Sequence, residues 1–181
     1  KRNAADECDC LPVEENIHKD KISHDSIVPS LVHASGVAQA EWAASKIADQ
    51  LQLVGTLAVE MVVLEDDKIV INELAPRPHN SGHYTIEACN ISQFHQHIRA
   101  VCGWPLRKPR LWAPSIMVNV LGEHVAPLKK IVTNYPDWSI HLYGKAEAKI
   151  KRKMGNVTIM TDDIEKVLVE IESTGIWSEE Y

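Results

Sequence analysis

The sequence predicts an α+β protein whose strands pair mostly antiparallel. The clearest sign is a pair of β-branched, apolar segments, LAVEMVVL at 57–64 and KIVINELA at 68–75, which only a short acidic turn separates. Other segments repeat apolar residues at three- and four-residue steps, as amphipathic helices do. The sequence shows neither an internal repeat nor a low-complexity tract. A hairpin together with separate helices is typical of the α+β class.

In the first half of the chain, residues 1–12 predict a short edge strand and residues 26–29 predict another. The segment between them, EENIHKDKISHD, is polar. A helix is predicted over 37–53, with Ser35 at its start and Gly55 after its end. Its apolar stripe consists of Val37, Ala40, Ala44, Ile47, Ala48 and Leu51.

After the hairpin, the loop PRPHNSGHYT at 76–85 leads into a helix predicted near 91–102. The segment GWPLRKPRLWAP at 103–114 holds three prolines and is the strongest candidate for a domain boundary. We therefore expect one domain over 1–103 and a small α/β domain over 104–181. In the second domain the pattern predicts strands at 115–121, 138–143 and 153–160 and helices near 126–132 and 162–173.

Composition and charge exclude several classes of function. A formal net charge of −6 argues against nucleic acid or an anionic membrane surface as the main partner. No apolar run reaches the roughly 18 residues of a membrane span, and the first ten residues lack the apolar core of a signal peptide. The four cysteines are too few and too scattered for a disulfide framework, so we expect reduced thiols and a cytoplasmic protein.

Two glutamates interrupt the predicted hairpin strands. Glu60 lies between apolar residues in the first strand, and Glu73 lies in the second. Buried glutamates are uncommon unless they are paired or bind a metal ion. If the acidic turn has two residues, Glu65 faces Lys68 and Glu60 faces Glu73, with the Cβ atoms of a facing pair about 4.5–5.5 Å apart.

Opposed carboxylates of Glu60 and Glu73 need a compensating charge. Two ionised carboxylates about 4 Å apart repel by roughly 4 kcal/mol at an effective dielectric constant of about 20. Mg²⁺ removes that cost, and it is commonly held by one or two carboxylates together with substrate phosphates. The alternative is an exposed face on which both glutamates are solvated, and a one-residue bulge would break the pairing. Spacing alone leaves both alternatives open.

The loop after the second strand concentrates side chains that can bind a small polar ligand. Pro76 and Pro78 stiffen it, and Arg77 offers a planar fork suited to a carboxylate, carbonate or phosphate group. Further donors and acceptors are His79, Asn80, Ser81 and His83. Generic surface loops are also polar and contain Pro and Gly, but they seldom place such a set directly after an acidic strand residue. The pattern therefore favours a binding function for this loop.

These segments resemble one family of enzymes. The string INELAPRPHNSGHYTIEACNISQFHQHIRAV at 71–101 is similar to the signature of the 5-(carboxyamino)imidazole ribonucleotide synthase family of ATP-grasp ligases. ENIHKDKISHDSIVPS before it and HLYGKAEAKIKRKMG after it match the family in the same order, so the resemblance covers nearly the whole chain. Biotin carboxylases carry E-x-N-x-R at the second acid, where this chain has N-E-x-A-x-R. Formate-dependent glycinamide ribonucleotide transformylases usually lack the H-N-S-G-H core.

The resemblance implies the C-terminal half of an ATP-grasp domain followed by a small C-terminal domain. It implies ATP and Mg²⁺ as cofactors and the ATP-dependent carboxylation of aminoimidazole ribonucleotide with bicarbonate, by way of carboxyphosphate, in purine biosynthesis. Small molecules are then the partners, with no nucleic acid and no membrane, and we expect the parent enzyme to be a homodimer.

The resemblance also implies roles for particular residues. The metal-holding acids match Glu60 and Glu73. The ATP site matches His18, Asn72 and Glu73. The catalytic loop that handles bicarbonate and the imidazole nucleotide matches Arg77, His79 and Asn80. The basic residues that reach the 5′-phosphate of the nucleotide match Lys145, Arg152 and Lys153, although without the resemblance this basic segment reads as a solvated strand.

Two departures from the family pattern bear on function. Asn156 stands where the family commonly carries His after M-G. The family's N-terminal domain and its ATP-clamping lid have no counterpart in the sequence, so we expect a fragment that is inactive by itself. The alternative function is a non-catalytic module that binds a metal ion, a nucleotide or another protein on the same fold.

Overall fold

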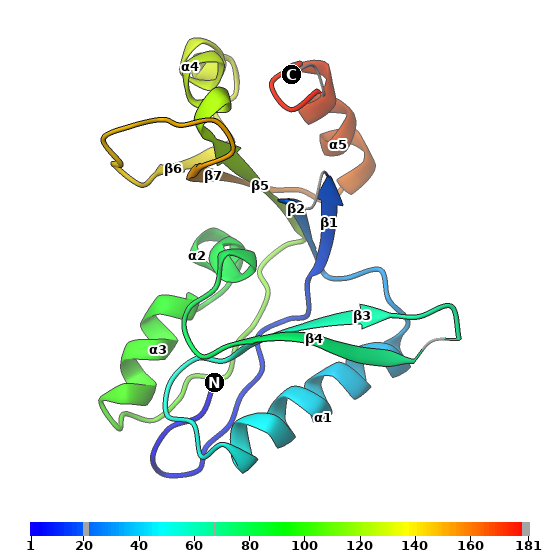
Figure 1. Ribbon diagram of the computed structural model, residues 1–181, viewed down its shortest axis with the longest axis vertical. Coiled ribbons are helices and arrows are strands. Elements are labelled where there is room, and N and C mark those ends of the chain that lie inside the picture. The colour runs from blue at the N-terminus through cyan, green and yellow to red at the C-terminus, as the bar shows by residue number, and fades with distance from the viewer. Residues whose placement is uncertain (20–21, 67, 179–181) are drawn as a thin grey trace. The chain divides into compact units, whose positions relative to one another are not determined.

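The computed structural model of the chain describes residues 1–19, 22–66 and 68–178, with the backbone alone at 18, 19 and 22–24. Figure 1 shows its helices and strands. No helix within these residues is long and apolar enough to cross a bilayer. All four cysteines carry free thiols. The α+β class with antiparallel sheets is confirmed.

The chain divides into two compact units, each of which takes two separate segments. The first unit comprises 1–15 and 28–112, and the second comprises 16–27 and 113–181. The domain boundary expected after residue 103 stays a prediction.

The first unit is built around a helix and a hairpin. Helix α1 (Ala34–Gln50) packs against both strands of the two-stranded antiparallel sheet, β3 (Ala58–Val63) and β4 (Ile69–Ala75) (Figure 1). The predicted helix at 37–53 therefore exists, but it begins and ends three residues earlier than predicted. Ser35 does not cap it, because the residue before its first turn is His33, whose side chain makes no capping hydrogen bond.

After β4 in the sequence, the chain forms three short helical elements: η1 (Asn80–Tyr84), α2 (Thr85–Ala88) and α3 (Gln93–Val101). The Ser92 side chain caps α3 by accepting a hydrogen bond from the His95 N–H at 3.2 Å. A Ser at this position is a common helix start because it satisfies a backbone donor that has no partner within the helix.

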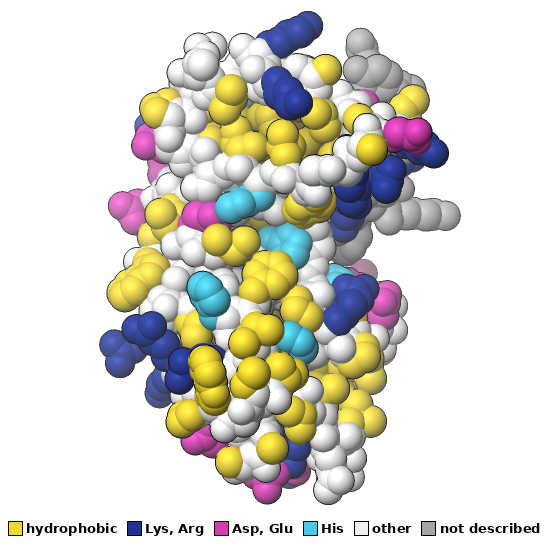
Figure 2. Space-filling view, turned by 90° about the vertical axis from the view of Figure 1, so that its left-hand side faces the viewer, with side chains coloured by type: hydrophobic (Ala, Val, Ile, Leu, Met, Phe, Trp, Pro, Cys, Tyr) yellow, Lys and Arg dark blue, Asp and Glu magenta, His cyan; other side chains and the backbone are white. Residues whose placement is uncertain are grey.

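Helix α3 buries polar side chains and exposes apolar ones, which is the reverse of an ordinary surface helix. Its buried positions include Gln93, Gln96 and Ala100. Phe94 and Ile98, by contrast, are 40% and 51% exposed. Figure 2 shows hydrophobic side chains, with histidines among them, over much of the surface in the lower part of the view. Apolar residues normally cover the buried face, so the two buried glutamines need polar partners inside the unit.

The second unit is a five-stranded sheet in the order β1-β2-β5-β7-β6, in which β5, β7 and β6 are antiparallel neighbours. Its strands are β1 (Glu15–Lys19), β2 (Ile22–Val28), β5 (Ser115–Leu121), β6 (Ser139–Leu142) and β7 (Lys153–Met160). Its helices are α4 (Gly122–Ile131), η2 (Val132–Asn134) and α5 (Ile164–Ser173). The strands predicted at 115–121 and 153–160 have the predicted bounds.

The core of the second unit forms where helices α4 and α5 meet the sheet. Alternate residues of β5 are fully buried: Ile116, Val118 and Val120. They belong to one hydrophobic cluster with Leu128 of α4. The other members of this cluster are Ile27, Trp138, Val157, Ile159, Val167, Ile171, Ile176 and Trp177. Alternation on a strand carries these side chains to one face.

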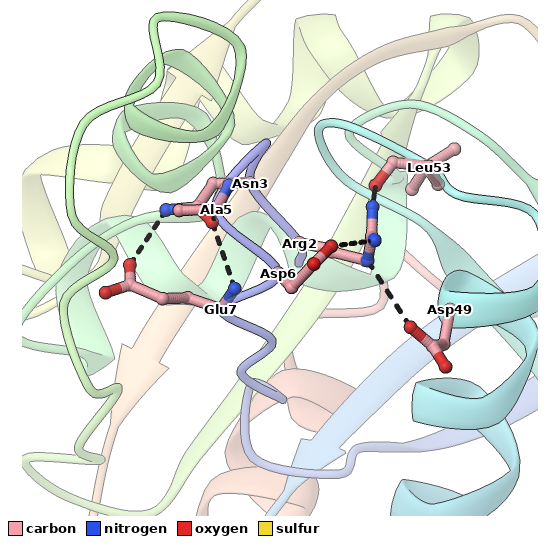
Figure 3. Close-up of polar contacts among 7 residues, drawn as sticks. All are labelled: Arg2, Asn3, Ala5, Asp6, Glu7, Asp49 and Leu53. Carbon is pink, nitrogen blue, oxygen red and sulfur yellow. Dashed lines mark hydrogen bonds and ion pairs between the residues drawn. The ribbon is translucent and has the colours of Figure 1, made fainter.

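The predicted edge strand at 1–12 is wrong. Its residues make only isolated bridges, from Arg2 to Cys8 and to Gly55. The Asn3 side chain accepts hydrogen bonds from the backbone N–H groups of Ala5 and Glu7, both at 3.0 Å, which folds the segment into a turn (Figure 3). Asn competes with regular backbone pairing in this way.

The polar segment 14–25, to which the sequence pattern assigns no strand before Ser26, forms strands in the structure. It contains β1 and most of β2, so the strand predicted at 26–29 begins at Ile22. The Ser26 hydroxyl donates to the Asn16 Oδ1 at 2.6 Å. Pairing within the sheet overrides the low strand propensity of this polar sequence.

Candidate active site

The β3–β4 hairpin pairs Glu60 directly with Glu73, as predicted. The turn is not the predicted one. The Leu64 N–H donates to the Lys68 carbonyl at 2.8 Å, so the strands close at Leu64 rather than at Glu65. Continued along both strands without interruption, this pairing would not bring the two glutamates opposite each other.

A β-bulge at Asn72 restores the pairing. Met61 pairs with Ile71 and the neighbouring Glu60 pairs with Glu73, so Asn72 is an extra residue without a cross-strand partner. From the spacing, a bulge is expected to break the pair; in the structure the bulge creates the pair. Bulges change the direction of side chains and recur near active sites, so strict alternation does not hold at Asn72, the residue predicted for the ATP site.

The two carboxylates are less buried than the sequence predicted. The Glu60 side chain is 29% exposed, and Glu73 is exposed. Facing residues of an antiparallel pair point to the same side of the sheet. Solvent reduces their repulsion towards about 1 kcal/mol, which weakens the electrostatic argument for a metal ion.

The oxygen ligands of this pair still suit Mg²⁺. In the described part of the chain, no three His, Cys, Asp or Glu side chains gather closely enough to hold a metal ion by themselves. Two carboxylates with the remaining positions taken by water and phosphate oxygens are the usual arrangement for Mg²⁺.

His79 connects the loop after β4 to the acidic pair. Its Nε2 lies 3.5 Å from Glu60 Oε1, and its Nδ1 lies 3.1 Å from Ser81 Oγ. The ring is therefore held at both nitrogens, and its side chain is only 17% exposed. When protonated, this imidazole would supply a positive charge beside Glu60.

Ser81 also contacts Glu14, a residue that no sequence motif marks as part of a site. The residue keeps part of its surface exposed, but its carboxyl group is withdrawn from water, and this burial raises its pKa. A hydrogen bond with Ser81 opposes that rise in pKa. Glu14, Ser81, His79 and Glu60 thus form a chain of successive polar contacts.

Hydrogen bonds of the fully buried Thr85 also hold this loop in place. Its hydroxyl donates to the Gly82 carbonyl at 2.6 Å and accepts from the Gln93 N–H at 2.8 Å. The Tyr84 hydroxyl donates to the Pro12 carbonyl at 2.7 Å. The sequence gives no signal for these ties, since all of them join residues brought together only by the fold.

The other predicted residues of this region are placed less specifically. Arg77 is exposed, and its guanidinium donates to the carbonyl of the adjacent Pro78 at 3.2 Å. Asn80 begins η1 and is half-buried. The side chain of His18 lies outside what the structure describes, although its backbone belongs to β1.

The predicted phosphate-binding cations gather around the connection between β6 and β7. Lys145 Nζ donates to the Lys153 carbonyl at 2.6 Å and lies 5.5 Å from the centre of the Tyr143 ring. Arg152 donates to the Glu147 carbonyl at 3.2 Å. Lys145 and Arg152 are exposed, and Lys153 begins β7. The segment that carries the first two is a loop rather than a basic strand.

Asn156, the departure from the family pattern, supports this connection from β7. It is almost completely buried, and its Nδ2 donates to the Tyr143 hydroxyl at 3.0 Å. Burial raises the pKa of Tyr143, and the bond from Asn156 opposes that rise. Asn156 thus fixes the ring over which the Lys145 ammonium lies.

Comparisons with known proteins assign both parts of the chain. The ATP-grasp domain family matches residues 1–94, and the phosphoribosylaminoimidazole carboxylase C-terminal domain family matches residues 115–170. The chain is 46% identical over 170 residues to the N5-carboxyaminoimidazole ribonucleotide synthase of Bacillus subtilis, which covers 94% of the chain and 45% of that protein.

Solved structures give the same result. A crystal structure of an N5-carboxyaminoimidazole ribonucleotide synthetase with ADP has a TM-score of 0.94 at 50% identity and covers 97% of this chain and 47% of that one. The Aspergillus clavatus enzyme, crystallised with ADP and 5-aminoimidazole ribonucleotide, has a TM-score of 0.84 at 34% identity over 91% of this chain and 46% of that one.

The chain spans about half the length of the relatives that it matches. The match covers both units, the acidic hairpin and the loop that follows it. The chain belongs to the ATP-grasp family and, within it, to the N5-carboxyaminoimidazole ribonucleotide synthases, of which it corresponds to the C-terminal part.

Proposed function

We propose that the protein containing this chain carboxylates aminoimidazole ribonucleotide with bicarbonate at the expense of ATP, as a carbon–nitrogen ligase of purine biosynthesis. The observation that carries the proposal is the Glu60–Glu73 pair with the His79 ring 3.5 Å from Glu60, in a chain whose relatives are synthases of this kind. The ADP and ribonucleotide complex of the Aspergillus clavatus enzyme supports these substrates.

In this proposal Glu60 and Glu73 would hold the Mg²⁺ ion that accompanies ATP. Mg²⁺ neutralises the charge that develops on the phosphoryl group during transfer. Asn72 and His18 are assigned to the ATP site together with Glu73. The bulge at Asn72 supports a role for its side chain near Glu73, because it removes the strict alternation that would turn the two apart.

Arg77, His79 and Asn80 are assigned to bicarbonate and the attacking amine. Bicarbonate oxygen takes the γ-phosphoryl group of ATP, with release of ADP, and the amine then attacks the carbon of carboxyphosphate and expels phosphate. Arg77 is exposed and offers a planar fork that suits the oxygens of bicarbonate. Positioning and charge neutralisation dominate such phosphoryl transfers, so the proposed reaction needs no nucleophilic side chain.

Lys145, Arg152 and Lys153 are assigned to the 5′-phosphate of the ribonucleotide. The exposure of the first two side chains supports this assignment, because a phosphate can replace the loop carbonyls as their hydrogen-bond acceptor. We further propose a cytoplasmic location, consistent with the free thiols, and a homodimer for the full-length protein.

The experiment is an ADP-release assay on the 181-residue chain and on the full-length protein that contains it. The full-length protein is expected to release ADP only when both bicarbonate and aminoimidazole ribonucleotide are present. The chain by itself is expected to be inactive, because the few contacts from its own residues cannot replace those of an ATP clamp. Absence of the double dependence in the full-length protein would favour the non-catalytic module.

A further inference from the structure

The buried carboxamide of Gln93 makes two hydrogen bonds to the backbone of His79. Gln93 is 1% exposed, and its Oε1 accepts from the His79 N–H at 2.9 Å while its Nε2 donates to the His79 carbonyl at 2.6 Å. His79 is extended, with φ −120° and ψ 154°. In an extended residue both groups point to the same side, so the Gln93 side chain takes the place of a neighbouring strand.

These two bonds fix the orientation of the carboxamide. A backbone N–H can only donate and a backbone carbonyl can only accept, so Oε1 and Nε2 of Gln93 are distinguished by their partners. The second hydrogen on Nε2 points at His83 Nδ1, 2.8 Å away. That nitrogen must therefore accept, and its ring proton stays on Nε2.

Protonation of His83 at Nδ1 would set two donors against each other. Turning the Gln93 carboxamide over would relieve that contact, but it would place Oε1 against the His79 carbonyl and lose both backbone bonds. The carboxamide is also confined by packing, because a Cβ atom on Gly82 would lie 2.7 Å from Gln93 Oε1. The clamp on His79 and the proton position on His83 therefore depend on one another.

We propose that Gln93 is a positioning residue of the candidate active site: it fixes the backbone of His79 and holds His83 as a neutral ring protonated on Nε2. Its importance for catalysis rests on the proposed function, which assigns His79 to the reaction. Through His79 the clamp also sets the position of the imidazole beside Glu60. No short motif encodes this link, since Gln93 comes 14 residues after His79.

Gln96 provides a matched control in the same helix. It is fully buried, and its carboxamide makes the same pair of bonds to a backbone residue, donating to the Arg107 carbonyl at 2.6 Å and accepting from the Arg107 N–H at 3.2 Å. Among the described residues, the Gln96 carboxamide makes no hydrogen bond to a histidine ring. Gln93→Met and Gln96→Met therefore remove equivalent backbone clamps, and only the first should alter His83.

The experiment is ¹⁵N NMR of the histidine side chains in the 181-residue chain at neutral pH, with the exposed His95 as the internal reference. Wild type is expected to show His83 as one unaveraged Nε2–H tautomer. In Gln93→Met the two ring nitrogens of His83 should shift away from their wild-type values, because Nδ1 loses its donor. In Gln96→Met they should stay as in wild type, although both variants lower Tm by comparable amounts.

An averaged or Nδ1-protonated His83 in wild type would overturn the proposal, and so would a His83 spectrum that Gln93→Met and Gln96→Met change equally. If Gln93→Met does not fold, a ¹⁵N–¹⁵N coupling across the hydrogen bond from Gln93 Nε2 to His83 Nδ1 in wild type decides, and its absence overturns the proposal. These measurements need no turnover. A ligase assay can therefore fail while the clamp is found, which would refute the proposed function alone.

Discussion

The loop after β4 and the connection between β6 and β7 carry the two sets of predicted site residues, and they are built in opposite ways. Ser81, Tyr84 and Thr85 of the first loop are buried, and it is bound from several sides by Gln93 and by residues upstream. The second is exposed throughout 143–152, and its cations bond to carbonyls of the same connection and of Lys153.

The difference follows from what each region is proposed to bind. Phosphoryl transfer requires reacting groups held in a fixed geometry, which a buried network supplies. A terminal phosphate can be held by flexible cations that form charge-assisted bonds when it arrives. The first loop should therefore be sensitive to changes in its supports, and the second should tolerate them.

The largest effect is expected from Glu73→Gln in the full-length protein. Gln keeps the volume and one oxygen but loses the charge that attracts Mg²⁺, so turnover in the ADP-release assay should be abolished. Removing one of two facing like charges at an exposed site should leave the free energy of unfolding in EDTA unchanged within about 1 kcal/mol or slightly raised. Near-normal turnover would refute the metal role, and a large loss of stability would make Glu73 a structural residue.

Thr85→Val should cost about 1–3 kcal/mol of unfolding free energy in urea. Val has a similar shape, but it leaves the buried Gly82 carbonyl and Gln93 N–H without their partner. Thr161→Val is the control, because the half-buried Thr161 makes two similar hydrogen bonds through its hydroxyl to the backbone of the exposed Asp163. Equal losses in the two variants would contradict the burial of the unpaired groups as the cause of the loss in Thr85→Val.

Glu14→Gln should change how stability depends on pH. Burial raises the pKa of Glu14 in the folded state, so that state holds the proton more tightly than the unfolded chain does. The protonated Glu14 therefore makes its full contribution to the free energy of unfolding below the pKa of the unfolded chain, about 4.3. This contribution is lost as the pH rises through the pKa of the folded state. The unfolding free energy of Glu14→Gln relative to wild type should therefore rise between pH 4 and 7. A fall over that range would mean that the carboxylate form is the stabilised one.

The smallest effect is expected from Arg152→Met in the exposed connection. Loss of the hydrogen bond from the Arg152 side chain to the Glu147 carbonyl should change the unfolding free energy by less than about 0.5 kcal/mol. Thermal melts of wild type and variant should nearly superimpose. A loss as large as that of Thr85→Val would show that this connection is as rigidly built as the loop after β4.

The hairpin shows both the reach and the limit of sequence reasoning. The apolar pattern predicted both strands and the Glu60–Glu73 pair, but the predicted turn was one residue out of register, and the bulge at Asn72 compensates for it. Strand propensity does not encode where a bulge falls. Strand propensity also missed β1 and the first residues of β2, which are polar and form strands because a sheet is available to pair with them.

In the candidate site, too, some residues could be predicted from the sequence and others could not. His79 could be predicted because it belongs to a short, specific string, and the structure brings it to Glu60. Gln93, Thr85 and Glu14 could not, because their roles arise from contacts across the fold that leave no periodic or motif signal. A buried polar residue in an apolar context is the one hint that such roles leave.

The central claim is that Glu60 and Glu73 share one cation, and a Mn²⁺ titration of the ¹⁵N-labelled 181-residue chain with ADP present tests it most directly. Paramagnetic broadening should be strongest at the backbone amides of Glu60, Glu73 and His79, and Glu73→Gln should weaken it at all three. Broadening centred instead on the exposed Asp66 of the turn, or unchanged by Glu73→Gln, would contradict the claim.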